Sequence, residues 1–177
     1  GQEESGAIPV DSSSAEMYTT IYAISESPKN GKVLWVGTDD GNVQITKDGG
    51  KSWKNVTANA GVPAGSWVST IDASRFDAGT AYVTFDRHTA GVMGPMVYKA
   101  TDYGATWQAL ATPENPKGLR GYAHVVREDP VNRGLLYVGT ELGLWISNND
   151  GGTWAQFSGG DFPAVAVRDI AIQPRDH

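Results

Sequence analysis

The chain has 177 residues, no cysteine and a formal net charge of −6. The absence of cysteine excludes disulfides, thiol catalysis and thiolate metal sites. Its basic residues are scattered singly, and no apolar stretch approaches the ~20 residues that cross a bilayer, so we expect neither nucleic-acid binding nor a membrane span.

The predicted elements come in groups of four short, β-rich runs, and the groups follow one another three times along the chain. The runs cover residues 18–27, 32–38, 42–46 and 52–56, then 67–74, 80–85, 96–100 and 106–110, then 122–128, 134–140, 143–147 and 153–157. Four short strands per repeat are typical of the blade of a β-propeller. We therefore predict an all-β propeller fragment of three four-stranded blades plus the first strand of a fourth. The expected boundaries are 17–58, 66–111 and 121–158 for the blades, 165–177 for the last strand, and 1–16 for an N-terminal loop.

A turn motif that ends in tryptophan recurs once in each predicted blade. Its copies are 46–53, 100–107 and 148–154, and the pattern is x-x-Asp-x-Gly-x-(Ser/Thr)-Trp. In a hairpin turn the Asp accepts hydrogen bonds from turn amides and the Gly supplies a positive φ, while the Trp packs over the inner side. We assign structural roles, with equivalent buried tryptophans, to Asp48, Gly50, Trp53, Asp102, Gly104, Trp107, Asp150, Gly152 and Trp154.

The motif resembles the Asp-box, or BNR repeat, whose pattern is Ser-x-Asp-x-Gly-x-Thr-Trp; here Ala100 and Asn148 stand at the Ser position. Beyond about residue 16 the chain resembles large bacterial Asp-box proteins related to sortilin, many of them labelled glycosyl hydrolases. The segments 81–88 and 167–175 carry this resemblance most clearly. It implies a multi-bladed propeller that is secreted or periplasmic. It also implies that the box stabilises the blade periphery, remote from any active site.

Loops on the face opposite the boxes are the candidates for function, because variable loops on a rigid scaffold carry binding and catalysis. Asp39 and Glu141 each follow a Gly-Thr pair and are the candidate acid/base pair for glycoside cleavage; the alternative is that both are solvated loop acids. Asp40 belongs to the same face. So does the cluster Asp86-Arg87-His88, which either serves proton transfer or is a loop held by an Arg–Asp pair with an exposed His.

The remaining histidines and arginines complete no known catalytic set. His124 lies within an apolar run and is predicted to be a packed strand residue, and the three histidines are too far apart in sequence to predict a metal site. Arg127 and Arg168 fall on first strands, but no third arginine with a paired Tyr/Glu completes a sialidase site. We expect no cofactor and no metal.

Two functions remain open from the sequence. The first is an extracytoplasmic, non-catalytic module that binds a protein or a glycan. The alternative is a fragment of a glycoside hydrolase acting on carbohydrate. Because three blades are fewer than the usual four to eight, we also expect either further blades in a longer chain or self-association of this one.

Overall fold

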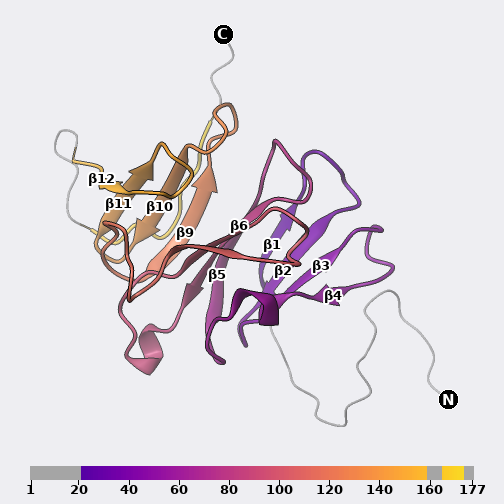
Figure 1. Ribbon diagram of the computed structural model, residues 1–177, viewed down its shortest axis with the longest axis horizontal. Coiled ribbons are helices and arrows are strands. Elements are labelled where there is room, and N and C mark those ends of the chain that lie inside the picture. Colours follow the sequence, from indigo (N-terminus) through magenta and orange to yellow (C-terminus); the bar gives the residue numbers. More distant parts are fainter. Residues whose placement is uncertain (1–20, 159–164, 174–177) are drawn as a thin grey trace.

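The computed structural model describes residues 21–158 and 165–173, and these form three antiparallel four-stranded sheets placed side by side (Figure 1). Each sheet is built from four consecutive strands. The strands are β1 Ile21–Glu26, β2 Leu34–Thr38, β3 Val43–Thr46 and β4 Lys54–Asn55; β5 Trp67–Ala73, β6 Ala81–Asp86, β7 Val97–Ala100 and β8 Gln108–Ala111; β9 Ala123–Glu128, β10 Leu136–Thr140, β11 Gly143–Ser147 and β12 Ala155–Gln156. The predicted all-β class and the three blades are confirmed.

Helix is confined to two short 3₁₀ segments, η1 Thr57–Ala60 and η2 His88–Ala90, in the ranges that the structure describes. No helix there is long and apolar enough to cross a membrane. The predicted N-terminal loop, residues 1–16, lies outside the described residues.

Neighbouring sheets are joined along their first strands, which lie side by side. The Ser25 hydroxyl of β1 accepts the Ala73 N–H of β5 at 2.9 Å, and the Thr70 hydroxyl of β5 accepts the Val126 N–H of β9 at 3.1 Å. One apolar core fills the space between the first and second sheets, and a second core fills the space between the second and third. The middle sheet is therefore covered on both faces, which is why every residue of β6 is buried.

A glycine in the second strand of two sheets allows this close approach. A Cβ at Gly37 would lie 2.3 Å from a methyl group of Val68, in the first strand of the next sheet. A Cβ at Gly139 would lie 2.3 Å from the carbonyl oxygen of Val167. The two Gly-Thr pairs noted in the sequence thus mark the places where the following first strand packs.

The segment 165–173 takes the place of that following first strand against the third sheet. The N–H of Val167 donates to the carbonyl of Thr140 at 2.8 Å. Within 165–173 the backbone forms no regular strand. The end of the predicted fourth-blade strand, 174–177, lies outside the described residues.

The turn motif of the first two sheets has the predicted hydrogen bonds. Asp48 accepts the backbone N–H of Ser52 at 2.9 Å and also its hydroxyl, and Asp102 accepts the N–H and hydroxyl of Thr106 at 2.9 and 2.6 Å. The hydroxyl bonds, followed by the amide bonds, lower the pKa of both carboxyl groups. Both aspartates are thus held as ionised turn acceptors.

In the third sheet the predicted alignment of the motif is wrong by one residue. Asn149, not Asp150, accepts the Thr153 N–H at 3.0 Å, and Ser147 occupies the hydroxyl position assigned to Asn148, donating to Asn149 at 2.8 Å. Asp150 instead has a φ of 57° and accepts the hydroxyl of Tyr82 at 2.8 Å together with the Lys99 ammonium. The sequence pattern misled because Asn can supply the same acceptor oxygen as Asp.

The glycine of the third motif moves by one residue as well. Gly151, at φ 81°, occupies the place of Gly104, at φ 82°; the predicted Gly152 does not. A Cβ at Gly104 would lie 2.7 Å from Val56, and one at Gly151 would lie 2.8 Å from Leu110. Each of these glycines therefore seats its turn against the end of the preceding sheet.

The three motif tryptophans are not equivalent, contrary to the prediction. Trp154 is buried in the core between the second and third sheets. Trp107 is half-buried, and its indole N–H donates to the carbonyl of Val56 at 3.1 Å, at the end of the first sheet. Each of these two rings packs toward the sheet before it. Trp53 is half-buried as well, but the described residues contain no sheet before the first for it to cover.

Candidate functional site

Each first strand carries a β-bulge at the same place, opposite the end of its partner strand. The extra residue is Tyr22 in β1, Ser69 in β5 and His124 in β9, because pairing skips from Ile21 to Ala23, from Val68 to Thr70 and from Ala123 to Val125. A bulged residue is unpaired, and its side chain is re-aimed relative to the regular alternation. The repeat therefore turns one side chain per sheet toward a common direction.

The three bulged residues line one groove of about 350 Å³. Trp67 and Tyr122, each two positions before a bulge, line it too, as does Arg168 of the segment 165–173. Asp86, at the end of β6, and His88, at the start of η2, complete the lining. The groove thus collects residues from all three sheets and from the segment that follows them.

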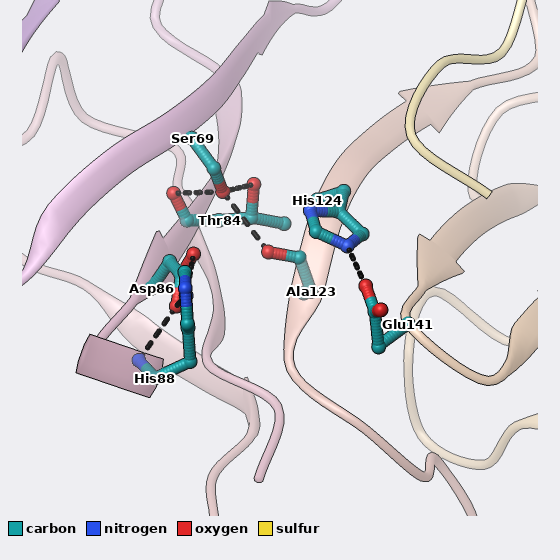
Figure 2. A network of polar contacts seen from close by, with 7 residues as sticks. All are labelled: Ser69, Thr84, Asp86, His88, Ala123, His124 and Glu141. Carbon is teal, nitrogen blue, oxygen red and sulfur yellow. Dashed lines mark hydrogen bonds and ion pairs between the residues drawn. The ribbon is translucent and has the colours of Figure 1, made fainter. Parts of the chain in front are cut away.

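Asp86 and His88 form the first polar pair of the groove (Figure 2). The Asp86 carboxylate, only 7% exposed, accepts the backbone N–H of His88 at 2.8 Å and lies 2.7 Å from its ring Nδ1. The His88 ring stacks on Tyr122 with centroids 4.4 Å apart and meets the edge of Trp67 at 6.3 Å. The loop after β6 is thereby fixed against the aromatic wall of the groove.

His124 and Glu141 form a second pair on the neighbouring sheet (Figure 2). His124 Nε2 lies 2.8 Å from a Glu141 carboxylate oxygen. This hydrogen bond lowers the pKa of Glu141, and a hydrogen bond from the Tyr122 hydroxyl and the charge of Arg168 lower it further. Burial, and then the nearby Glu141 charge, raise the pKa of Tyr122, so its phenol remains a neutral donor. Glu141 is therefore an ionised acceptor and is unsuited to act as a general acid.

A chain of hydroxyl groups bridges the two sheets between these pairs. Ser69 Oγ lies 2.7 Å from Thr84 Oγ1 and donates to the carbonyl of Ala123, next to His124, at 3.1 Å (Figure 2). Thr70 Oγ1 lies 2.6 Å from the same Thr84 hydroxyl. These bonds fix the spacing of the two sheets at the groove, so the site is largely preformed.

The predicted acid pair Asp39 and Glu141 does not meet in this groove. Neither Asp39 nor Asp40 lines it. Asp40 accepts the hydroxyl of Thr38 and, at 2.8 Å, the side-chain N–H of Asn42, which makes it an acceptor within its own turn. Glu141 reaches the groove only through His124 and Tyr122.

Within the predicted Asp86-Arg87-His88 cluster, the carboxylate pairs with the histidine and not with the arginine. Arg87 lines a different cavity and no part of the groove. The expectation of a loop held by an Arg–Asp pair is wrong, because residues 86 and 88 share a side of the backbone and residue 87 faces away. The prediction that His124 is a packed strand residue is also incomplete, because its side chain is 16% exposed and is paired with Glu141.

Sequence reasoning missed most of the groove. The missed residues are Tyr22, Trp67, Ser69, Tyr122, His124 and Arg168. One signal was present in the sequence. Two of the predicted first strands begin with an aromatic residue followed two positions later by a polar one: Trp67 and Ser69 in one, Tyr122 and His124 in the other. Among the described residues, no group of three His, Cys, Asp or Glu side chains is placed to hold a metal ion.

Comparison with known proteins gives a likeness in fold only. No protein-family model matches the chain, and no curated protein matches it by sequence. Solved structures do resemble it. The sequences of three of them are less than 25% identical to this chain, so the likeness concerns the fold alone.

Three solved structures illustrate the likeness. An ancestral GH74 enzyme is 22% identical over 80% of this chain, with a TM-score of 0.61, and the match covers 19% of that enzyme. The GH74 xyloglucanase of Xanthomonas campestris is 18% identical over 78% of the chain, covering 20% of its own length at a TM-score of 0.59. YCF48 of Cyanidioschyzon merolae is 19% identical over 78%, covering 37% of its length at a TM-score of 0.56. The chain spans well under half of each neighbour, and its fold is that of a β-propeller section.

Proposed function

We propose that this chain is a binding module and that its groove takes a glycan. The observation that supports this most strongly is the aromatic lining. Trp67 is 38% exposed and Tyr22 is 58% exposed, and both line the groove beside hydrogen-bonding side chains. Flat aromatic faces with a few placed polar groups are the chemistry that packs against the C–H faces of sugar rings and binds their hydroxyl groups.

The charges of the groove fit a neutral, hydroxyl-rich ligand. Asp86, which lines the groove, is engaged by His88, and Arg168 adds one cation; Glu141, which lies behind the lining residues, is engaged by His124. No strong field of one sign is left to select a highly charged partner. The Asp86 carboxylate, although held by His88, retains lone pairs with which to accept sugar hydroxyl groups.

The wider setting of the proposal follows from the fold. One structural neighbour is a xyloglucanase, and another YCF48 structure, 16% identical at a TM-score of 0.57, is described as bound to a D1 peptide. Propeller sections of this kind thus occur in proteins that act on a glycan or bind a peptide. We further propose that the module belongs to the Asp-box group and works outside the cytoplasm, as its turn motifs suggest.

Catalysis is the weaker reading of the same groove. Glycoside cleavage needs one carboxyl group that is protonated and donates to the leaving oxygen. Glu141 has a lowered pKa and so does not meet this requirement. A glycoside hydrolase fragment whose second acid lies on further blades remains the rival proposal.

A titration of soluble oligosaccharides, followed by tryptophan fluorescence and calorimetry, tests the binding proposal. We expect saturable binding that weakens about tenfold in Trp67→Ala, as for loss of a central aromatic contact, and is largely retained in Trp67→Phe. Val131→Ala is the matched control, because Val131 is 68% exposed and does not line the groove. Binding of unstructured peptides with no binding of any glycan would overturn the glycan assignment.

The rival needs its own measurement. The chain is incubated with a panel of glycosides and the release of reducing ends is followed. We expect no turnover. Turnover that disappears in Glu141→Gln or Asp39→Ala would establish the hydrolase and refute the non-catalytic module.

A further inference from the structure

Residues at and just after the end of β6 line two separate cavities. Asp86 and His88 line the groove, whereas Arg87, between them, lines a separate cavity of about 250 Å³ that shares no lining residue with the groove. This second cavity is also lined by Tyr98 of β7 and by Thr112 and Glu114, which follow β8. It is therefore formed by the second sheet alone together with the loop that precedes that sheet.

The guanidinium of Arg87 has no protein acceptor in the described part of the chain. Its Nε is buried and makes no hydrogen bond, and Arg87 takes part in none of the ion pairs found there. A buried, charged N–H group without an acceptor has lost its hydrogen bonds to water and has formed none with the protein. Such a group, beside a cavity, is the feature expected of a site that a ligand completes.

Two further donors face the same cavity. The hydroxyl of Tyr98 makes no hydrogen bond among the described residues, and burial, with a smaller contribution from Glu114, raises its pKa, so it stays protonated. Thr112 Oγ1 accepts the N–H of Asn115 at 3.1 Å, which leaves its own proton available to donate. Arginine, tyrosine and threonine thus present donors, and the single acidic group of the cavity is Glu114.

The cavity is held open by its own backbone. The carbonyl of Arg87 accepts the N–H groups of Ala90 at 2.9 Å and Val92 at 3.2 Å, which fixes the loop. Gly94 packs so closely on Pro113 that an added Cβ would lie 2.8 Å from the proline Cα. The phenol ring of Tyr98 is fixed edge-on against Phe85, with centroids 5.6 Å apart. The donors are therefore preorganised, which lowers the cost of binding.

We propose that this cavity binds the carboxylate of a small monoanionic ligand. The guanidinium fork of Arg87 matches the two oxygens of a carboxylate, and the Tyr98 hydroxyl supplies a third hydrogen bond. Arg87 is the one cation among the lining residues, and Glu114 already places a negative charge there, so a dianion is disfavoured relative to a monoanion. The exposed carboxylate of Glu114 opposes a second negative charge in the same space and sets a limit on affinity.

The test is an NMR titration of the ¹⁵N-labelled chain with sodium acetate at constant ionic strength. The Arg87 Nε–H resonance and the backbone amides of residues 87–92 are followed. Acetamide, which has the same shape without the charge, is the control ligand, and inorganic phosphate is the test of charge. We expect saturable shifts with acetate, none with acetamide, and weaker binding of phosphate than of acetate.

Variants decide whether these donors cause the binding. Arg87→Gln should weaken acetate binding at least tenfold, Tyr98→Phe should weaken it severalfold, and Glu114→Gln should tighten it severalfold. Dispersion of the remaining amide resonances shows that each variant is folded, and Arg87→Lys, which retains the charge but not the fork, should fall between wild type and Arg87→Gln.

Several results would overturn the proposal. Linear shifts without saturation, equal shifts with acetamide, or unchanged acetate binding in Arg87→Gln would each do so. Tighter binding of phosphate would refute the carboxylate class. If the Arg87 Nε–H resonance moved on the change Glu114→Gln and did not respond to acetate, Glu114 would be the hydrogen-bond partner of Arg87 and the proposal would be refuted.

Discussion

His124 Nε2 and Glu141 Oε2 lie 2.8 Å apart, and this contact joins a bulged strand residue to the loop that follows β10. Because the bond favours the ionised carboxylate, the pKa of Glu141 is below its ordinary value of 4.5. The pair fixes the face of the imidazole that the groove presents. It also makes the stability of this region depend on pH.

The first prediction concerns that pH dependence. A carboxyl group whose pKa is lower in the folded than in the unfolded chain stabilises the fold above the unfolded pKa, and the stabilisation is lost as the pH falls through the folded pKa. We expect wild type to be more stable than Glu141→Gln at pH 6–7, and the difference to shrink progressively below a pH of about 4.5. Urea unfolding at a series of pH values measures it. A difference that grows toward acid pH would contradict the assignment.

The second prediction concerns the third turn motif. Asn149→Ala removes the acceptor of the Thr153 N–H, so we expect a loss of about 1–2 kcal/mol in the free energy of unfolding. Asn149→Asp keeps the acceptor that Asp48 and Asp102 provide elsewhere and should stay within about 1 kcal/mol of wild type. Chemical denaturation measures both. Equal stability of Asn149→Ala and wild type would restore Asp150 as the turn acceptor.

The third prediction ranks the motif tryptophans. Trp154→Ala should cost about 3–5 kcal/mol, because the ring is buried between two sheets. Trp107→Ala removes a half-buried ring and its bond to Val56. Trp53→Ala removes a half-buried ring for which the described residues provide no preceding sheet. We expect the losses to fall in the order Trp154, Trp107, Trp53. Urea midpoints of the three variants, compared at equal m-value, provide the ranking; equal losses would show that the three sites are equivalent after all.

The fourth prediction concerns the outer face of the first sheet. Ser25 points toward the second sheet, so Ile24, next to it in β1 and 62% exposed, faces away from that sheet together with Ile21. This is the apolar face that a neighbouring blade would cover. We propose that a second copy covers it in solution, burying more than about 1,000 Å².

Sedimentation equilibrium at tens of micromolar tests the association. Wild type should form a dimer or a larger assembly, and Ile24→Lys should shift it to the monomer. Val131→Lys is the matched control, because Val131 is also exposed but lies in the loop between β9 and β10 of the third sheet, so its substitution should leave the association intact. A wild type that remains monomeric at this concentration would refute the proposal.

The parts of the fold that local chemistry dictates were predictable. Two kinds of motif recur at fixed places and mark where strands end. They are the turn motifs around Asp48 and Asp102 and the Gly-Thr pairs at residues 37–38 and 139–140. The third motif was misaligned because Asn149 and Asp150 are adjacent and both are good turn residues, and only the bond to Thr153 distinguishes them.

The groove was harder to predict, because it depends on pairing between strands. A bulge at His124 exists only in relation to β10, and no local property of the run around it marks the skipped residue. The partner of Asp86 was misjudged for a related reason: a strand end that turns into η2 brings residues 86 and 88 together and sends residue 87 away. Such relations arise in three dimensions and not along the chain.

The shared position of the bulges has an evolutionary consequence. Because a bulged residue leaves its ladder unpaired at that point, its side chain can be exchanged without breaking the backbone hydrogen bonds of the ladder. Tyr22, Ser69 and His124 already show three different chemistries on one backbone plan. Each repeat thus contains one position at which the side chain can vary. A propeller built from such repeats can acquire a new ligand by substitution at these positions while its strands keep their pairing.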